Sequence, residues 1–279
     1  MKIIFMGKEK EAAIKSLLHL LERGVEIIAI VGPPAEVESP SGFKLIDIAR
    51  SNNIHFCTET EIYNLFERQG SSLSVEVDYV LSFLYWNKIK EPLLSAPKQG
   101  CINFHPAPLP EYRGVGGYNI AILDGLPYWG VSAHFIDESI DTGDIIAEKR
   151  FSIDPTKETA LSLERKSMKA MYELFIEVVD ALEKNLPTEG KRQPNGRYIS
   201  FKEMEEMKEI ALNASIEEVE KRIRAFWFPP YRGAYIEIAG RKYTLVNDEL
   251  LEEISSLYKE VRRVEDEYGL KELYKRHKE

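Results

Sequence analysis

Two residues with reactive side chains follow a short apolar run in the segment CINFHP at 101–106. If Ile102 and Phe104 belong to a strand, Asn103 and His105 stand two apart and point to the same face of it. The proline after His105 stops the strand, because proline has no backbone N–H to donate. An imidazole, with an ordinary pKa of about 6.5, can accept a proton near neutral pH, and an amide N–H can donate to an oxyanion. The segment therefore predicts proton-transfer and oxyanion chemistry at a strand end.

A carboxylate in a second motif completes this chemistry. The segment ESIDTGDII at 138–146 places Asp141 36 residues after His105. A carboxylate beside a histidine holds the ring in one tautomer and stabilises its protonated form. A lone histidine beside prolines is more often a structural loop residue, so the second motif is what favours catalysis. We predict that Asp141 orients His105.

Together the two motifs resemble those of the formyltetrahydrofolate-dependent formyltransferases, which include methionyl-tRNA, glycinamide-ribonucleotide and amino-sugar formyltransferases. The shared pattern is N-x-H-P-x-x-L-P-x-[YW]-R-G followed by I-D-x-G-x-I-I, and weaker similarity covers 1–187 and 215–246. The resemblance implies transfer of a formyl group from 10-formyltetrahydrofolate, a cosubstrate, to an amine. It also implies that Asn103, His105 and Asp141 are the catalytic residues.

The resemblance places the two substrates as well. It implies that the folate pterin lies beside SFLYWNKI at 82–89, where backbone groups around Tyr85, Trp86 and Ile89 would bind it. The glycine-rich segment RGVGGYN opens a predicted helix whose N-terminal amides could face an anion. Arg113 and Gly114 are therefore candidates for binding the acceptor, and a plain turn is an equally good interpretation of that segment.

Composition and charge set the class of protein. The 279 residues are 44% hydrophobic and 30% charged, as in soluble globular proteins, and the length suggests two domains. The N-terminal apolar run is too short for a signal peptide and no apolar stretch could cross a bilayer, so we expect a cytoplasmic protein. The formal net charge of −9 argues against a surface built to neutralise many phosphates.

The metal-ligating residue types are few and scattered. Cys57 and Cys101 lie in apolar settings, which indicates buried thiols rather than a disulfide or a metal site. His134 alternates with apolar residues, which is more typical of a core histidine than of a ligand. We therefore expect no metal.

The elements that must position the motifs are predicted to form an α/β fold. Strands are predicted at 2–7 and 25–32, joined by an amphipathic helix that ends at Gly24, and this β-α-β unit implies parallel strands. A helix near 43–52, a short strand at 54–57 and an apolar run at 77–84 continue the alternation. The prediction is an open, mostly parallel Rossmann-like sheet flanked by helices, with ligands beyond the carboxyl ends of its strands. The first strand is not followed by G-x-G-x-x-G, so a dinucleotide cofactor has no support.

The second half of the chain divides into two parts. Paired strands at 129–135 and 144–153 flank the Asp141 loop, and a long helix at 157–184 packs on the sheet. The proline- and glycine-rich stretch that follows marks a boundary, so we assign 1–195 to a catalytic domain and 196–279 to a smaller C-terminal α+β domain. That domain contains a helix, a β-hairpin at Gly240 and a charged amphipathic segment at 248–278. The terminal segment packs on its own domain, which is the default, or on a second subunit of a homodimer.

The acceptor is the least determined feature. In the tRNA branch of the family, the resemblance implies a basic loop after the second strand, whereas GPPAEVESPSGFK carries Glu36 and Glu38. This favours a nucleotide-linked amino sugar, with methionyl-tRNA as the alternative acceptor. The aromatic and basic segment FWFPPYRG at 226–233 could stack on a base, although core packing explains Phe226 and Trp227 equally well. A non-catalytic folate or nucleotide-sugar binding module, and hydrolysis of the formyl group to formate, remain open alternatives.

Overall fold

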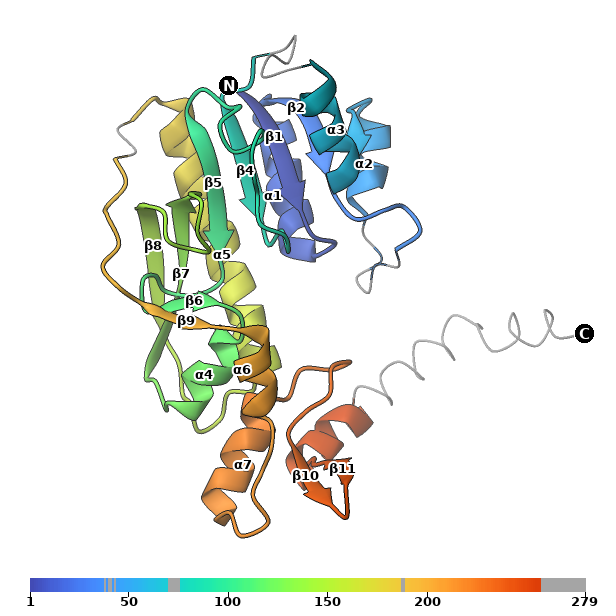
Figure 1. Ribbon diagram of the computed structural model, residues 1–279, viewed down its shortest axis with the longest axis vertical. Coiled ribbons are helices and arrows are strands. Elements are labelled where there is room, and N and C mark those ends of the chain that lie inside the picture. The colour runs from blue at the N-terminus through green and yellow to red at the C-terminus, as the bar shows by residue number, and fades with distance from the viewer. Residues whose placement is uncertain (38, 40–41, 43, 70–75, 187–188, 257–279) are drawn as a thin grey trace, which may run out of the picture.

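The computed structural model describes residues 1–37, 39, 42, 44–69, 76–186 and 189–256. Its centre is a seven-stranded sheet in the order β3-β2-β1-β4-β5-β7-β8 (Figure 1). The first five strands in that order are parallel, while β7 is antiparallel to both β5 and β8. The predicted open, mostly parallel sheet is confirmed. The strands are β1 Lys2–Gly7, β2 Glu26–Val31, β3 Phe56–Cys57, β4 Tyr79–Phe83, β5 Gly100–His105, β7 Tyr128–Phe135 and β8 Ile145–Ser152.

Helices cover both faces of this sheet. One face packs against α1 (Glu11–Glu22), α2 (Leu45–Ser51) and α5 (Ala160–Glu183), and the other against α3 (Glu59–Gln69). The spacing of apolar residues explains α5, whose buried side chains recur every three or four positions and form one continuous face. A capping box between Thr159 and Ser162 starts this helix.

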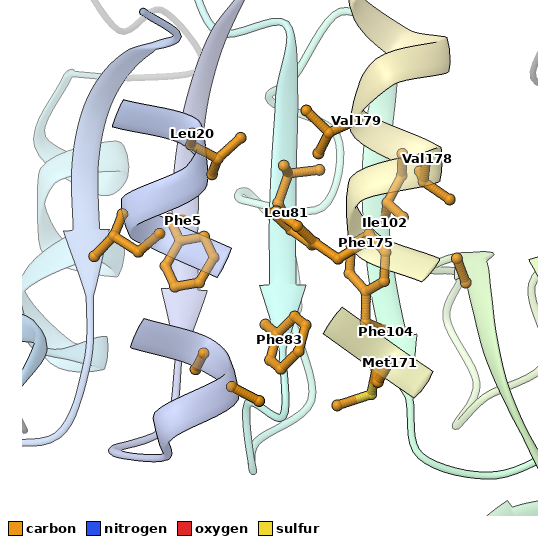
Figure 2. Packing of buried hydrophobic residues seen from close by; sticks show 14 of the residues in the cluster. Phe5, Leu20, Leu81, Phe83, Ile102, Phe104, Met171, Phe175, Val178 and Val179 are labelled. Atoms are coloured by element: carbon orange, nitrogen blue, oxygen red, sulfur yellow. The ribbon is translucent and has the colours of Figure 1, made fainter. Parts of the chain in front are cut away.

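Three phenylalanine rings pack α5 on the sheet beside β5, the strand that carries Asn103 and His105 (Figure 2). Phe104 of β5 lies 4.8 Å from Phe175 of α5, centroid to centroid, and Phe83 of β4 lies 5.7 Å from both rings. All three side chains are fully buried. Truncating such a ring to alanine typically costs about 3–5 kcal/mol of stability. This packing sets the position of the strand end where the first motif lies.

The C-terminal part is smaller and contacts the sheet domain through several of its elements. Strand β9 (Arg197–Ile199) pairs in parallel with β6 (Tyr112–Gly114), and α7 (Ile216–Ala225) packs against α4 (Gly117–Leu123). The predicted domain boundary at 195 stays a prediction, since β9 lies beyond it and yet pairs with β6. The remaining elements are α6 Phe201–Glu206, β10 Tyr235–Ile238 and β11 Arg241–Thr244.

The helix and the hairpin expected in this part are present. The Ser215 side chain accepts a hydrogen bond from the Glu218 N–H at the start of α7, and Gly240 lies in the turn between β10 and β11. Helical backbone also covers 248–256, and the rest of the predicted terminal helix lies outside the described residues. In the part of the chain that the structure covers, no helix is long and apolar enough to cross a membrane.

Candidate active site

The first motif lies at the carboxyl end of β5, next to the point where the sheet changes from parallel to antiparallel. Ile102 and Phe104 point into the core under α1 and α5, so Asn103 and His105 project from the opposite face, as the alternation predicts. Both residues line a pocket of about 410 Å³. Its walls come from the ends of β1, β4, β5 and β7, from the loops beyond them, and from β6 and β9. The lining residues are Lys8, Ser82, 84–89, 103–106, Gly114, Val115, His134, Ile136, 139–141 and Tyr198.

The carboxamide of Asn103 is held in one orientation. Ser82 Oγ donates to Asn103 Oδ1 at 2.8 Å, and Asn103 Nδ2 lies 3.2 Å from His134 Nε2. His134 Nδ1 lies 2.6 Å from the Phe135 carbonyl, which can only accept, so Nδ1 carries the ring proton and Nε2 accepts from the amide. One Asn103 N–H uses His134, and the other is left as a donor for a ligand in the pocket.

His105 is placed to act as a proton acceptor. Its Nε2 lies 3.0 Å from the carbonyl oxygen of Tyr112 and must donate to it, which leaves the lone pair of the neutral ring on Nδ1. Burial is the largest effect on the pKa of His105 and lowers it. The Asp141 carboxylate acts in the other direction and raises this pKa, while His134 lowers it further. Because the net shift is downward, the ring is neutral at pH 7 and Nδ1 is free to take a proton.

Asp141 lies between the two histidines. Its carboxylate oxygens are 3.6 Å from His105 Nδ1 and 3.6 Å from His134 Nε2, and the Gly114 N–H donates to Oδ2 at 2.9 Å. Burial alone would raise the pKa of this carboxyl. At the low pH where the carboxyl loses its proton, however, His105 is still protonated, and its charge, with the contact from His134 and the hydrogen bond from the Gly114 N–H, holds the carboxyl pKa well below its usual range. Asp141 is therefore ionised, and its negative charge faces the atom of His105 that receives the proton.

The Asp141 loop is held in an unusual backbone conformation. Asp141 has a φ of 54°, in the left-handed region that favours glycine. Gln193 Nε2 donates to the Asp141 carbonyl at 3.2 Å, and the Arg113 guanidinium donates to Gln193 Oε1 at 2.8 Å and to the Pro194 carbonyl at 2.9 Å. Arg113 thus supports the loop through Gln193 and is not among the residues that line the pocket, whereas Gly114 is. Acceptor binding by Arg113 and Gly114 stays a prediction.

Two aromatic side chains form part of the wall of the same pocket. Tyr85 and Trp86 follow β4 with ring centroids 4.6 Å apart, and Trp86 is 46% exposed. Ile89, which also lines the pocket, is buried at 2% exposure. Leu84, directly before the pair, has a φ of 57°, which turns the chain sharply at the strand end. The Lys88 ammonium donates to the Glu138 carbonyl and so joins this wall to the second motif. Folate binding by Tyr85, Trp86 and Ile89 stays a prediction.

Metal-ligating clusters are missing from the described residues: no group of three His, Cys, Asp or Glu side chains there could hold a metal ion. Burial raises the pKa of both Cys57 and Cys101 to about 12, so both remain protonated thiols. Neither cysteine lines the pocket.

Sequence reasoning missed two residues of the site. His134 is buried, as expected of a core histidine, but its Nε2 faces Asn103 and Asp141. Ser82 and His134 are the register partners of Asn103 on β4 and β7 respectively. The sequence did offer one signal for His134: it is a histidine within the apolar strand that leads directly into the Asp141 motif.

Comparisons with known proteins agree with this geometry. The profile of the formyl transferase family matches residues 1–179. The chain is 29% identical to a methionyl-tRNA formyltransferase from Wolbachia sp. subsp. Drosophila simulans over 251 residues, covering 88% of this chain and 80% of that one. It is 32% identical to a GDP-perosamine N-formyltransferase from Brucella melitensis over 225 residues, covering 80% and 84%.

A solved structure shares the fold. The N-formyltransferase from Helicobacter canadensis, in complex with folinic acid and dTDP-3-aminofucose, superimposes with a TM-score of 0.68 at 25% identity. The match covers 89% of each chain.

Proposed function

The chain belongs to the formyl transferase family, and we propose that it transfers a formyl group from 10-formyltetrahydrofolate to the amino group of a nucleotide-linked amino sugar. The observation that carries the proposal is the convergence of Asn103, His105 and Asp141 on one pocket with complementary states. One amide N–H is left for a ligand, one imidazole is neutral, and one carboxylate is ionised beside it.

In the proposed reaction, Asn103, His105 and Asp141 assist a single acyl transfer. The donor supplies a formyl carbon bound to a folate nitrogen; the acceptor amine attacks that carbon, and the bond to the folate nitrogen breaks. Asn103 Nδ2 donates to the formyl oxygen as it gains negative charge, and one such donor typically contributes on the order of 3 kcal/mol to the transition state. Its orientation is fixed in advance by Ser82 and His134, so no reorganisation is needed during the reaction.

His105 handles the proton of the amine. Nδ1 accepts it as the new C–N bond forms, and the resulting imidazolium carries its charge 3.6 Å from the Asp141 carboxylate. The same proton is then available to the departing folate nitrogen, so the ring returns to its neutral form. Gly114 and Tyr112 hold the two partners through backbone hydrogen bonds throughout.

Charge supports the sugar acceptor over tRNA. The formal net charge is −9, and Glu36 is exposed in the loop after β2, while Glu38 lies outside the described residues. Negative charge in this loop repels a phosphate backbone that approaches it. Methionyl-tRNA remains the second candidate acceptor, because relatives that act on it align with most of this chain at similar identity.

The test is a competition between acceptors. The protein is incubated with 10-formyltetrahydrofolate and, in parallel, with GDP-, dTDP- and UDP-linked amino sugars, with methionyl-tRNA at physiological salt, and with no amine. We expect formylated amino sugar and stoichiometric tetrahydrofolate, and Asn103→Ala serves as the control with strongly reduced activity. Formylation of the tRNA and of no sugar would refute the acceptor, and formate release without amine would indicate hydrolysis.

A further inference from the structure

An aromatic pair outside the core lies where the C-terminal part meets α1 and α5. The rings of Phe228 and Tyr231 have centroids 5.8 Å apart at an interplanar angle of 34°, and the Lys10 ammonium lies 5.7 Å from the Phe228 centroid. Tyr231 is 64% exposed. Phe226, from the same segment, is buried in the core of the smaller part, so packing explains that residue and leaves the outer pair unexplained.

The pair is held on a rigid support. The Leu161 N–H at the start of α5 donates to the Trp227 carbonyl at 3.0 Å, and the Tyr231 N–H donates to the Phe228 carbonyl at 3.0 Å. The first bond ties the segment after α7 to the capped end of α5, and the second closes a turn within that segment. Figure 1 shows this segment following α7. An aromatic surface that is fixed before a ligand arrives loses little conformational entropy on binding.

Two lysines of one loop lie at this surface and at the catalytic pocket. Lys8 lines that pocket, and Lys10 follows it in the same short loop between β1 and α1, where the Lys10 N–H donates to the Lys8 carbonyl at 2.7 Å. Lys10 uses one of its three ammonium donors on Glu164 at 3.0 Å, and an ammonium group has two more. No ion pair involves Lys8 within the part of the chain that the structure describes.

We propose that the nucleotide half of the acceptor binds here: the base stacks on Phe228 and Tyr231, and the diphosphate lies along Lys10 and Lys8 toward the catalytic pocket. The inference rests on the proposed function, because the linked amino sugar must reach Asn103 and His105. Aromatic stacking and ammonium–phosphate contacts are the interactions that such a ligand needs. Two lysines suit a diphosphate, whereas a tRNA strand needs a longer cationic path than this acidic chain provides.

The experiment measures nucleotide binding directly. GDP, UDP and dTDP are titrated into the full chain by calorimetry, and the same variants are assayed for formyl transfer. We expect Tyr231→Ala to raise the Kd of the best-bound nucleotide about tenfold, since stacking on one aromatic ring is worth about 1–3 kcal/mol. Tyr231→Phe keeps the ring and should bind nearly as wild type. Lys8→Gln should weaken binding and reduce its salt dependence.

Matched controls come from the same chain. Tyr243 is 47% exposed on β11, and Lys202 is 86% exposed at its side chain on α6, so Tyr243→Ala and Lys202→Gln remove the same groups elsewhere. Neither control should change the Kd. With the amino-sugar nucleotide, Tyr231→Ala should raise the acceptor KM by the same factor as the Kd, while kcat and the KM of the folate donor change less than about twofold.

Several outcomes would overturn the proposal. The first is an unchanged Kd for the nucleotide in both Tyr231→Ala and Lys8→Gln. The second is a Tyr231→Ala protein in which the KM of the folate rises instead of the KM of the acceptor. The third is a loss of activity in these variants that is confined to methionyl-tRNA formylation. Failure to bind any of the three nucleotides while amino sugars are formylated would do the same. In contrast, Tyr231-dependent nucleotide binding without formyl transfer to any sugar would support this site and contradict the proposed acceptor.

Discussion

The interaction between Asp141 and His105 can be tested with the substitution Asp141→Asn, which keeps the shape of the side chain and removes its charge. At the observed separation of 3.6 Å and an effective dielectric constant of about 20, a carboxylate attracts an imidazolium by about 4 to 5 kcal/mol. Loss of this attraction disfavours the protonated ring in the folded protein. The pKa of His105, already lowered by burial, should therefore fall further.

The assay is kcat/KM for formyl transfer as a function of pH. The active form has neutral His105, so the acid limb of the wild-type profile should lie below the ordinary histidine value, and Asp141→Asn should move it to lower pH by about one unit or more. The plateau should fall by about a hundredfold, because the imidazolium that forms during turnover loses its partner. Asp144→Asn, an exposed carboxylate in the same loop, is the control and should change neither quantity. An acid limb that stays in place, or moves to higher pH, would refute the assigned coupling.

Three further predictions follow from the site. His105→Ala and Asn103→Ala should each lower kcat by on the order of a hundredfold with an unchanged unfolding midpoint, and losses below about tenfold in both would reject their roles. Ser82→Ala frees Asn103 Oδ1 and should lower kcat by about tenfold with little change in the donor KM, whereas an unaltered kcat would show that the amide needs no such support. Dialysis against a chelator should leave activity intact, and activity that disappears and returns with zinc would contradict the expectation that no metal is needed.

Sequence alone determined those features that depend on neighbours along the chain. The alternation around Ile102 and Phe104 puts Asn103 and His105 on one face of a strand, and the proline after them ends it. Strand and helix periodicities predicted the parallel sheet and the long helix α5 with small errors at the ends. Two motifs in order sufficed to indicate the family, because each holds several residue types at fixed spacing.

Tertiary structure alone decided what flanks the proposed catalytic side chains. Ser82 and His134 reach Asn103 only because β4 and β7 pair with β5 in one register, and a shift of one residue would turn both away. Arg113 reaches the Asp141 loop through Gln193, 80 positions along the chain, and periodicity carries no information about such a contact. Local patterns fix which face of an element a side chain occupies. Register and long-range packing are set by the whole core. They decide which ring nitrogen of His105 is left to accept a proton and where the Asn103 amide points.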